Sequence, residues 1–143
     1  MNFDELRQAA HAVVAPRELS PFASAGSVGA ALVSDSGAVY TGVCIDTACS
    51  MGFCAEHAAA AAMITRGENR VVRMVAVDVD GRITQPCGRC REFISQLHTA
   101  NAATKVLVSD KTVVTLQELL PFDWRAGVTH SAPSGAGQPE PSA

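Results

Sequence analysis

Three cysteines in two short segments limit the folds open to this chain more than any other feature. Cys54 belongs to the segment Cys54-Ala55-Glu56, and the other two belong to Pro86-Cys87-Gly88-Arg89-Cys90. Thiolates in such a set are typical zinc ligands, and a zinc ion held by three protein ligands keeps its fourth position open for water. A fold that uses all three cysteines must bring two segments that lie far apart in the sequence to one point.

Each segment is expected to lie at the beginning of a helix. The run Ala55–Ile64 is rich in alanine, the strongest helix former, and the run Arg89–His98 has its apolar residues at helical spacing. Cys54 and Cys87 would then lie at helix N-termini, where unpaired N–H groups and the helix dipole favour thiolates. We therefore expect two such helix ends that converge on one zinc ion to lower the pKa values of all three thiols.

Glu56 follows Cys54 by two residues, so its carboxyl can reach the same site without being a ligand. A metal ligand, any residue and Glu, followed later by Pro-Cys-x-x-Cys, is the pattern typical of zinc-dependent nucleobase deaminases. One alternative is that the Cys-x-x-Cys pair is a redox pair, and another is that Cys44 or Cys49 completes a structural four-cysteine site. Because Glu56 is in register and Cys49 lacks knuckle spacing, we favour a catalytic metal site.

The chain resembles the small cytidine deaminase family, which includes the blasticidin S deaminases. Besides the two cysteine segments, the matching text is Val28-Gly29-Ala30-Ala31-Leu32, Tyr40-Thr41-Gly42 and Glu118-Leu119-Leu120-Pro121, within about residues 27 to 122. The resemblance implies a three-layer α/β/α fold with a mixed five-stranded sheet, often assembled as a tetramer. It also implies hydrolytic deamination at C4 of a pyrimidine. In that reaction Cys54, Cys87 and Cys90 hold Zn²⁺, Glu56 moves protons and the peptide of Ala55 contacts the base.

Several departures from the family pattern concern the sugar-binding region. Ordinary cytidine deaminases read Gly-Cys-Asn-(Val/Ile)-Glu-Asn-Ala before the first zinc ligand, and the Asn and Glu bind the ribose. Here Cys44 replaces the Asn and Asp46 replaces the Glu, so both are candidate substrate contacts with a weaker or shorter side chain. The loop that follows is one residue shorter than in the family, and Gly26 stands where the family has Phe.

Two further departures lie beside the metal ligands. Arg89 occupies a position where blasticidin deaminases often have Arg and cytidine deaminases commonly have Ala. His57 follows the glutamate, where cytidine deaminases commonly have an Arg that donates to the zinc thiolates. Because three thiolates leave a zinc centre negatively charged, such donors withdraw charge from sulfur. His57 either makes one such hydrogen bond or lies on the first helical turn with no special partner.

The sequence predicts a zinc-dependent hydrolytic deaminase of a free cytosine nucleoside, producing uridine or deoxyuridine and ammonia from cytidine or deoxycytidine. The alternative substrate is blasticidin S or another C4-substituted pyrimidine nucleoside. A more remote alternative is a non-catalytic zinc-stabilised interaction module. Nucleic acid is not expected as a partner, because a net charge of −3 provides no basic surface for phosphates.

Composition also bears on localisation and assembly. Five cysteines, an odd number, and an acidic start without a signal-peptide core predict a cytoplasmic protein, and no apolar run reaches the length of a membrane span. With 48% hydrophobic and only 17% charged residues, the chain is expected to form a homo-oligomer, in keeping with the tetramers of the family. A role in pyrimidine salvage would follow from the predicted substrate.

The order of predicted elements is that of a layered α/β domain over residues 1–130, followed by a disordered tail over 131–143 that is rich in Pro, Gly and Ser. A capping box at Asn2 and Glu5 opens the first helix, and Pro16 to Pro21 is a break. Trp124 either caps a pocket across a subunit interface or covers the core. The expected helices are 3–15, 55–64 and 89–98, the expected strands are 27–33, 39–45, 71–79, 105–108 and 113–115, and a helical turn is expected at 116–120.

Overall fold

The computed structural model describes residues 1–127, so the predicted tail and the last three residues of the predicted domain lie outside the described part. Its helices are α1 (Phe3–Ala12), α2 (Ala55–Thr65) and α3 (Gly88–Leu97). Its strands are β1 (Arg17–Ser20), β2 (Ala23–Ser34), β3 (Val39–Thr47), β4 (Val71–Val77), β5 (Lys105–Ser109) and β6 (Thr112–Thr115). Short 3-10 turns are η1 (Ala48–Ser50), η2 (Thr99–Ala103) and η3 (Gln117–Leu119).

The described strands form one mixed sheet in the order β1-β2-β4-β5-β6, and β3 pairs with β2 as well. Only β4 and β5 run parallel; the other pairs are antiparallel. The predicted α/β fold with a mixed sheet is confirmed, but the sheet has six strands instead of five. The additional strand is β1, within the stretch that we expected to be a break. Pro16 and Pro21 flank this strand, so the residues between them keep the N–H groups that pairing requires.

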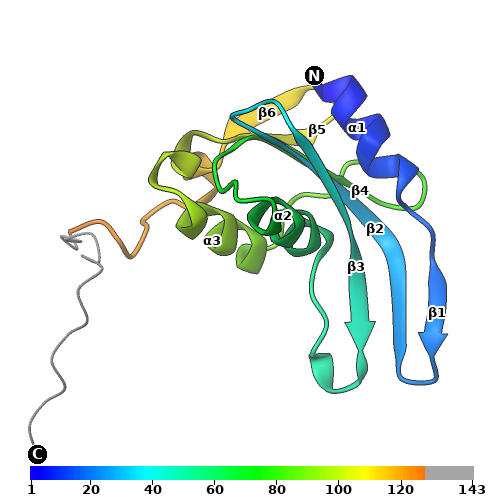
Figure 1. Cartoon of the computed structure of the whole chain (residues 1–143). Coiled ribbons are helices and arrows are strands. Elements are labelled where there is room, and N and C mark those ends of the chain that lie inside the picture. The colour runs from blue at the N-terminus through cyan, green and yellow to red at the C-terminus, as the bar shows by residue number, and fades with distance from the viewer. Residues whose placement is uncertain (128–143) are drawn as a thin grey trace, which may run out of the picture.

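Helices cover both faces of the sheet, which gives the three layers visible in Figure 1. Helix α1 lies on one face, and α2 and α3 lie side by side on the other. Because successive strand residues point to opposite faces, neighbouring residues enter different cores. Leu32 and Met74 belong to the core beneath α2 and α3, whereas Ala31 and Val75 pack with Leu6 of α1.

Helix α1 begins as predicted but ends early. The Asn2 and Glu5 capping box is present, whereas the helix stops at Ala12 instead of continuing to Ala15. Beyond the helix, the Ala15 N–H donates to the Gly26 carbonyl over 3.0 Å. Gly26 has a φ of +89°, and a Cβ there would lie 2.1 Å from the Ala15 oxygen. A larger residue, such as the Phe of the family pattern, is therefore excluded at this point.

Strand β2 changes its partner part-way along its length. Its first residues pair with β1, and the segment from Gly29 to Ser34 pairs with β4, with an irregular stretch between Ala25 and Gly29. Strand β3 runs beside both halves. As a result, the β1–β2 turn and the end of β3 project past the helices (Figure 1).

Asn101 is a buried polar residue that joins three elements below α3. Its Oδ1 accepts the N–H of Val71, at the beginning of β4, over 2.9 Å. Its Nδ2 donates to the carbonyl of Ile94 in α3 over 2.9 Å and to that of Asn69 over 3.1 Å. Buried polar groups need such partners, because an unpaired one retains its full desolvation cost.

We expect Asn101→Ala to lower the free energy of unfolding by about 3 kcal/mol, because it leaves a buried N–H and buried carbonyls without partners. Urea denaturation followed by circular dichroism measures the change. Thr99→Ala, an exposed residue of the same turn, is the matched control and should change stability by less than about 0.5 kcal/mol. Equal effects of the two substitutions would contradict this role for Asn101.

Candidate metal centre and active site

Three thiols from two helices meet at one point. The Sγ atom of Cys87 lies 3.5 Å from that of Cys54 and 3.4 Å from that of Cys90, and all three atoms lie within 4.8 Å of one another. Cys90 is buried, Cys54 is half-buried and Cys87 is exposed. The set is therefore open to solvent on one side and enclosed on the other.

The helix ends place these thiols. Cys54 is the N-cap residue of α2, Cys87 is the N-cap residue of α3, and Cys90 lies in the first turn of α3. Neither N-cap side chain makes a capping hydrogen bond, so both sulfurs are free to face the cluster. Both helices begin where the sequence predicts.

The helix N-termini alone do not lower the pKa values of all three thiols, and the effect expected with zinc stays a prediction. Burial raises the pKa values of Cys54 and Cys90, since an apolar surrounding penalises the charged form. Burial also acts on Cys87, but hydrogen bonds from the backbone N–H groups of Cys90 and Arg89 outweigh it, and the pKa of Cys87 is lowered. The helix N-terminus thus acts on the exposed thiol, and a cation is needed to stabilise all three thiolates.

Glu56 lies in the first turn of α2 and is only 4% exposed. Burial raises the pKa of its carboxyl, and a hydrogen bond with the Cys90 thiol lowers it by less. A buried carboxyl with a raised pKa can hold a proton closer to neutral pH than an ordinary one. Glu56 is thus positioned beside the thiols as a proton donor and acceptor.

Close contact between α2 and β3 fixes the first turn of α2. Gly42 of β3 lies against this turn, where a Cβ would be 2.4 Å from the Ala59 nitrogen and 2.8 Å from the Ala55 oxygen. Only glycine permits this approach. Ala55 itself is fully buried, and its peptide stands at the N-terminus of α2 next to Cys54.

A two-residue bridge fixes the chain just before Cys54. The Ile45 N–H donates to the Phe53 carbonyl over 3.0 Å, and the Phe53 N–H donates to the Ile45 carbonyl over 2.9 Å. Gly52 passes so close to this bridge that a Cβ would lie 1.9 Å from the Ile45 oxygen. The loop between the two bridge residues is therefore closed at its base.

His57 contacts both the cluster and α3. Its Nδ1 lies 3.4 Å from the Cys90 Sγ, and its ring stacks on that of Phe93 with centroids 4.2 Å apart and an interplanar angle of 14°. Burial lowers the pKa of His57, and the charge of Arg89 lowers it further. His57 therefore lies within hydrogen-bonding distance of one thiol of the cluster.

The two arginines of the second segment bind backbone carbonyls. Arg89 donates from Nη1 to the Gly52 carbonyl over 3.3 Å, and so links α3 to the loop before Cys54. Arg91 donates to the carbonyls of Pro86 over 2.8 Å and Leu119 over 3.3 Å. Both side chains thus fix the loops around the cluster.

Cys44 is buried, and its thiol faces the irregular stretch of β2. The Val28 N–H donates to its Sγ over 3.3 Å, and the Ser27 hydroxyl lies 3.2 Å away. Cys44 also packs with Ala55 in a small apolar cluster. The contact with Ser27 and Val28 could not be predicted from the sequence, because it depends on the irregular pairing of β2.

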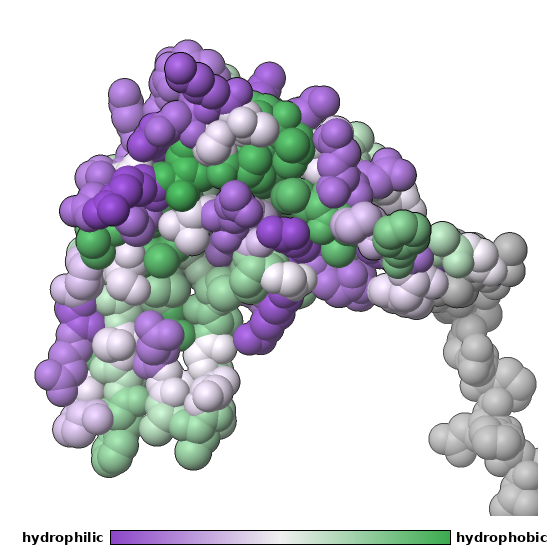
Figure 2. Space-filling model, turned by 180° about the vertical axis from the view of Figure 1, so that it is seen from behind, coloured by the Kyte–Doolittle hydropathy of each residue, from purple (hydrophilic) through white to green (hydrophobic). Residues whose placement is uncertain are grey.

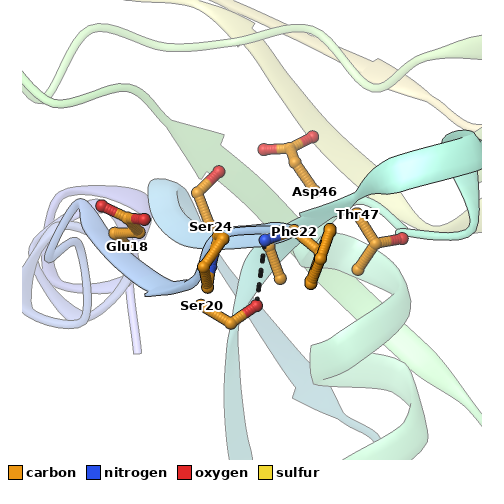
Figure 3. Close-up of a pocket in the computed structure, with 8 residues that line it drawn as sticks. Glu18, Ser20, Phe22, Ser24, Asp46 and Thr47 are labelled. Atoms are coloured by element: carbon orange, nitrogen blue, oxygen red, sulfur yellow. Dashed lines mark hydrogen bonds between the residues drawn. The ribbon is translucent and has the colours of Figure 1, made fainter.

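Asp46 lies beyond Cys44 on β3 and is exposed. Within residues 1–127 its carboxylate makes no hydrogen bond or ion pair that would occupy it. It stands opposite Ser24 in the register of β2 and β3, and the two side chains point to the same side in Figure 3. Asp46 and Ser24 line an open depression of about 350 Å³, together with residues that include Phe22 and Thr47.

Of the two roles predicted for Trp124, covering the core is wrong, and capping a pocket across a subunit interface stays a prediction. Its ring is 58% exposed, so it does not cover the core. Its Nε1 donates to Glu92 of α3 over 2.6 Å, and Arg125 beside it binds Ser95 over 2.9 Å. The segment after η3 is therefore held on the outer side of α3 within its own chain.

Phe93 is the residue of the site that the sequence analysis missed. The helical spacing of the run Arg89–His98 indicates only that Phe93 lies on the apolar face of its helix. Its spacing was an available signal, because Phe93 follows Cys90 by three residues, as His57 follows Cys54. Residues at this spacing share one face of a helix.

The donor set suits zinc. Cysteine thiolates are soft ligands that suit the borderline-soft Zn²⁺ ion, and no fourth protein ligand joins the cluster among the described residues. A layered α/β chain with such a centre and a buried carboxyl beside it belongs to the class of zinc-binding domains of the catalytic kind. In the described part, no helix is long and apolar enough to cross a membrane.

The chain belongs to the family described as the cytidine and deoxycytidylate deaminase zinc-binding region, whose model matches residues 4–106. A cytidine deaminase from Halalkalibacterium halodurans is 38% identical over 100 residues, which are 66% of this chain and 74% of that protein. A cytidine deaminase from Mycobacterium tuberculosis is 36% identical over 69 residues, 48% of this chain. That match spans about half of the relative's length, 52%.

The fold is also that of solved cytidine deaminases. A crystal structure of cytidine deaminase from Mycobacterium leprae superposes with a TM-score of 0.71 at 31% sequence identity, covering 85% of this chain and 98% of that one. The predicted three-layer architecture is therefore shared with this family. The zinc requirement is supported together by the family match and by the three-thiol cluster.

Proposed function

We propose that this chain is a zinc-dependent hydrolytic deaminase that converts cytidine or deoxycytidine to uridine or deoxyuridine and ammonia. The observation that carries the proposal is a buried glutamate in the first turn of α2, beside three thiols that converge from the N-termini of α2 and α3. Cys54, Cys87 and Cys90 hold the zinc. Similarity to cytidine deaminases supports the choice of substrate.

Bound zinc supplies a Lewis acid that lowers the pKa of water towards neutrality. The protein's own part is proton transfer and positioning. Water adds at C4 and the C4–N4 bond breaks, so one proton of water must reach N3 and the other must leave with ammonia. Glu56 is the group that carries them, since burial keeps its pKa high enough to hold and release a proton. The Ala55 peptide, at the fixed end of α2, contacts the base.

We expect Glu56→Gln to lower kcat by about 10³-fold or more, the contribution typical of a general acid and base, while zinc content stays unchanged. Turnover is followed by ultraviolet absorbance and zinc by atomic absorption. Glu68→Gln, just beyond the opposite end of α2, is the matched control, because an amide can keep hydrogen bonds with Ser36 and Tyr40. Full turnover by Glu56→Gln would support the non-catalytic zinc module instead.

The substrate panel for this experiment is cytidine, deoxycytidine, cytosine and blasticidin S. Activity on blasticidin S alone would favour the alternative substrate class. Arg89 is the reason for including blasticidin S, because it stands beside the cluster at a position where blasticidin deaminases often have Arg. If the zinc-bound protein turns over none of the four compounds, the proposed substrates are contradicted.

Asp46 is the group that we propose to bind the sugar. Its carboxylate is exposed and unoccupied by protein partners in the described residues, so it can accept a hydroxyl hydrogen bond. Cys44, the other candidate substrate contact, has its thiol facing Val28. We therefore assign Cys44 the task of shaping the strand that presents Asp46.

We expect Asp46→Ala to lower kcat/KM for cytidine by about 10-fold or more, the cost of losing a hydrogen bond to a charged group, and to leave stability unchanged. Cys44→Ser is the paired variant, and its activity should stay within about threefold of the original, since a hydroxyl can also accept the Val28 N–H. Steady-state kinetics measure both. An unaltered kcat/KM in Asp46→Ala would show that the sugar is bound elsewhere.

We also propose that the chain is a homo-oligomer, with a tetramer as the expected form. Leu19, Phe22, Met51 and Phe53 are exposed at the projecting end of β1, β2 and β3. Figure 2 shows pale-green, apolar side chains at the tip of this projection. Such a group of apolar side chains is typical of a surface that another subunit covers. The five free cysteines fit a cytoplasmic location, and the proposed reaction fits pyrimidine salvage.

We expect sedimentation velocity to show an assembly larger than a monomer, and we expect the double substitution Phe22→Ser and Met51→Ser to shift it towards the monomer. Both side chains are about three-quarters exposed, at 74% and 77%, so their loss from a subunit interface removes apolar burial without disturbing the core. Val113→Ser, on the exposed side of β6, is the control and should leave the assembly intact. A monomeric original chain would contradict the proposal.

A further inference from the structure

The proposed chemistry gives no task to Phe93, although its ring lies close behind the thiol cluster. His57 follows Cys54 by three residues in α2, and Phe93 follows Cys90 by three residues in α3. Each ring therefore projects one helical turn beyond a cysteine and on the same face. The two rings meet between the helices and stack with centroids 4.2 Å apart.

The contact between His57 and Cys90 has a defined direction once zinc is bound. A cysteine that binds zinc is a thiolate, and a thiolate can only accept a hydrogen bond. The Nδ1 atom of His57, 3.4 Å from the Cys90 Sγ, must then carry the hydrogen. Cys90 is the buried thiol of the three, so it benefits most from a partner for its charge.

Other side-chain N–H groups near the cluster have different partners. Arg89 donates to the Gly52 carbonyl, and Arg91 donates to the carbonyls of Pro86 and Leu119. The Cys87 thiol accepts hydrogen bonds from backbone N–H groups in the first turn of α3. Within residues 1–127, His57 is consequently the side-chain N–H group available to a thiol of this cluster.

His57 is not itself a member of the metal-ligand set. The ligand atoms that lie within 4.8 Å of one another are the three sulfurs, and no His57 nitrogen joins them in the described part of the chain. Its ring must nevertheless keep one orientation, because rotation about χ2 would move Nδ1 away from Cys90. Torsions of this kind have broad minima, so neighbouring atoms must supply the restraint.

We infer that Phe93 is a positioning residue, whose stacked ring holds the His57 imidazole so that its Nδ1–H donates to the Cys90 thiolate and strengthens zinc binding. The flat stack, at an interplanar angle of 14°, restrains the imidazole plane and leaves its edge free for the sulfur. In this chain a restrained imidazole thus supplies the N–H that donates to the thiolate. The inference rests on the proposed function only in that the three thiols bind zinc.

The test measures the zinc dissociation constant of the full chain by competition with a chromogenic chelator. We expect His57→Ala and Phe93→Leu each to weaken zinc binding by about 10- to 100-fold, the range found when a group that orients a metal ligand is removed. The double variant should be no weaker than His57→Ala alone, because Phe93 acts through His57. Phe93→Tyr keeps the ring and should retain the original affinity.

Two further measurements separate positioning from general stability. Phe3→Leu removes a partly buried ring from the opposite side of the sheet and should leave zinc affinity unchanged. Cobalt-substituted protein should show the same shift of its thiolate-to-cobalt absorption in His57→Ala and in Phe93→Leu. If Phe93→Leu does not fold by circular dichroism, Phe93→Met takes its place.

Three results would overturn the inference. The first is an unchanged zinc affinity in Phe93→Leu, and the second is additive losses in the double variant. The third is a complete loss of zinc in His57→Ala, which would make His57 a ligand. None of these results depends on turnover, so failure of the proposed deaminase reaction would leave this comparison intact.

Discussion

The site depends on one constraint: two helix N-termini must stay at the same place while three thiols, one of them buried and one half-buried, carry charge. Close contact supplies this constraint. Gly42 lets the first turn of α2 lie directly on β3, and the Arg91 hydrogen bonds fix the loop before α3. Since burial raises the pKa values of Cys54 and Cys90, the cation and the helix ends have to act together at this point.

The sequence predicted the parts of the fold that depend on local signals. The helices after Cys54 and Cys87 begin at their cysteines, and the capping box opens α1, because these features depend on residues within a few positions of one another. Strand β1 was not predicted, since its four exposed residues have no apolar pattern and form a strand only by pairing with β2. The early end of α1 is likewise set by the distant Gly26.

The same division applies within the site. The three thiols and Glu56 could be recognised because their spacing is itself the signal, whereas the thiol pKa values depend on burial that no spacing reveals. The partner of Cys44 follows from an irregular strand pairing. The stack of His57 on Phe93 joins two helices, and only the shared three-residue offset from a cysteine hinted at it.

The bridge between Ile45 and Phe53 separates the loop between these residues from the metal centre. The sequence of the loop can therefore change faster in evolution than that of the metal centre. Because both ends of the loop are tied together, residues can be gained or lost within it while the chain still arrives at Cys54 in the same position. The loop of this chain, one residue shorter than the family pattern, is such a case. The metal centre can therefore be inherited unchanged while the surface that we propose to bind the sugar is remodelled.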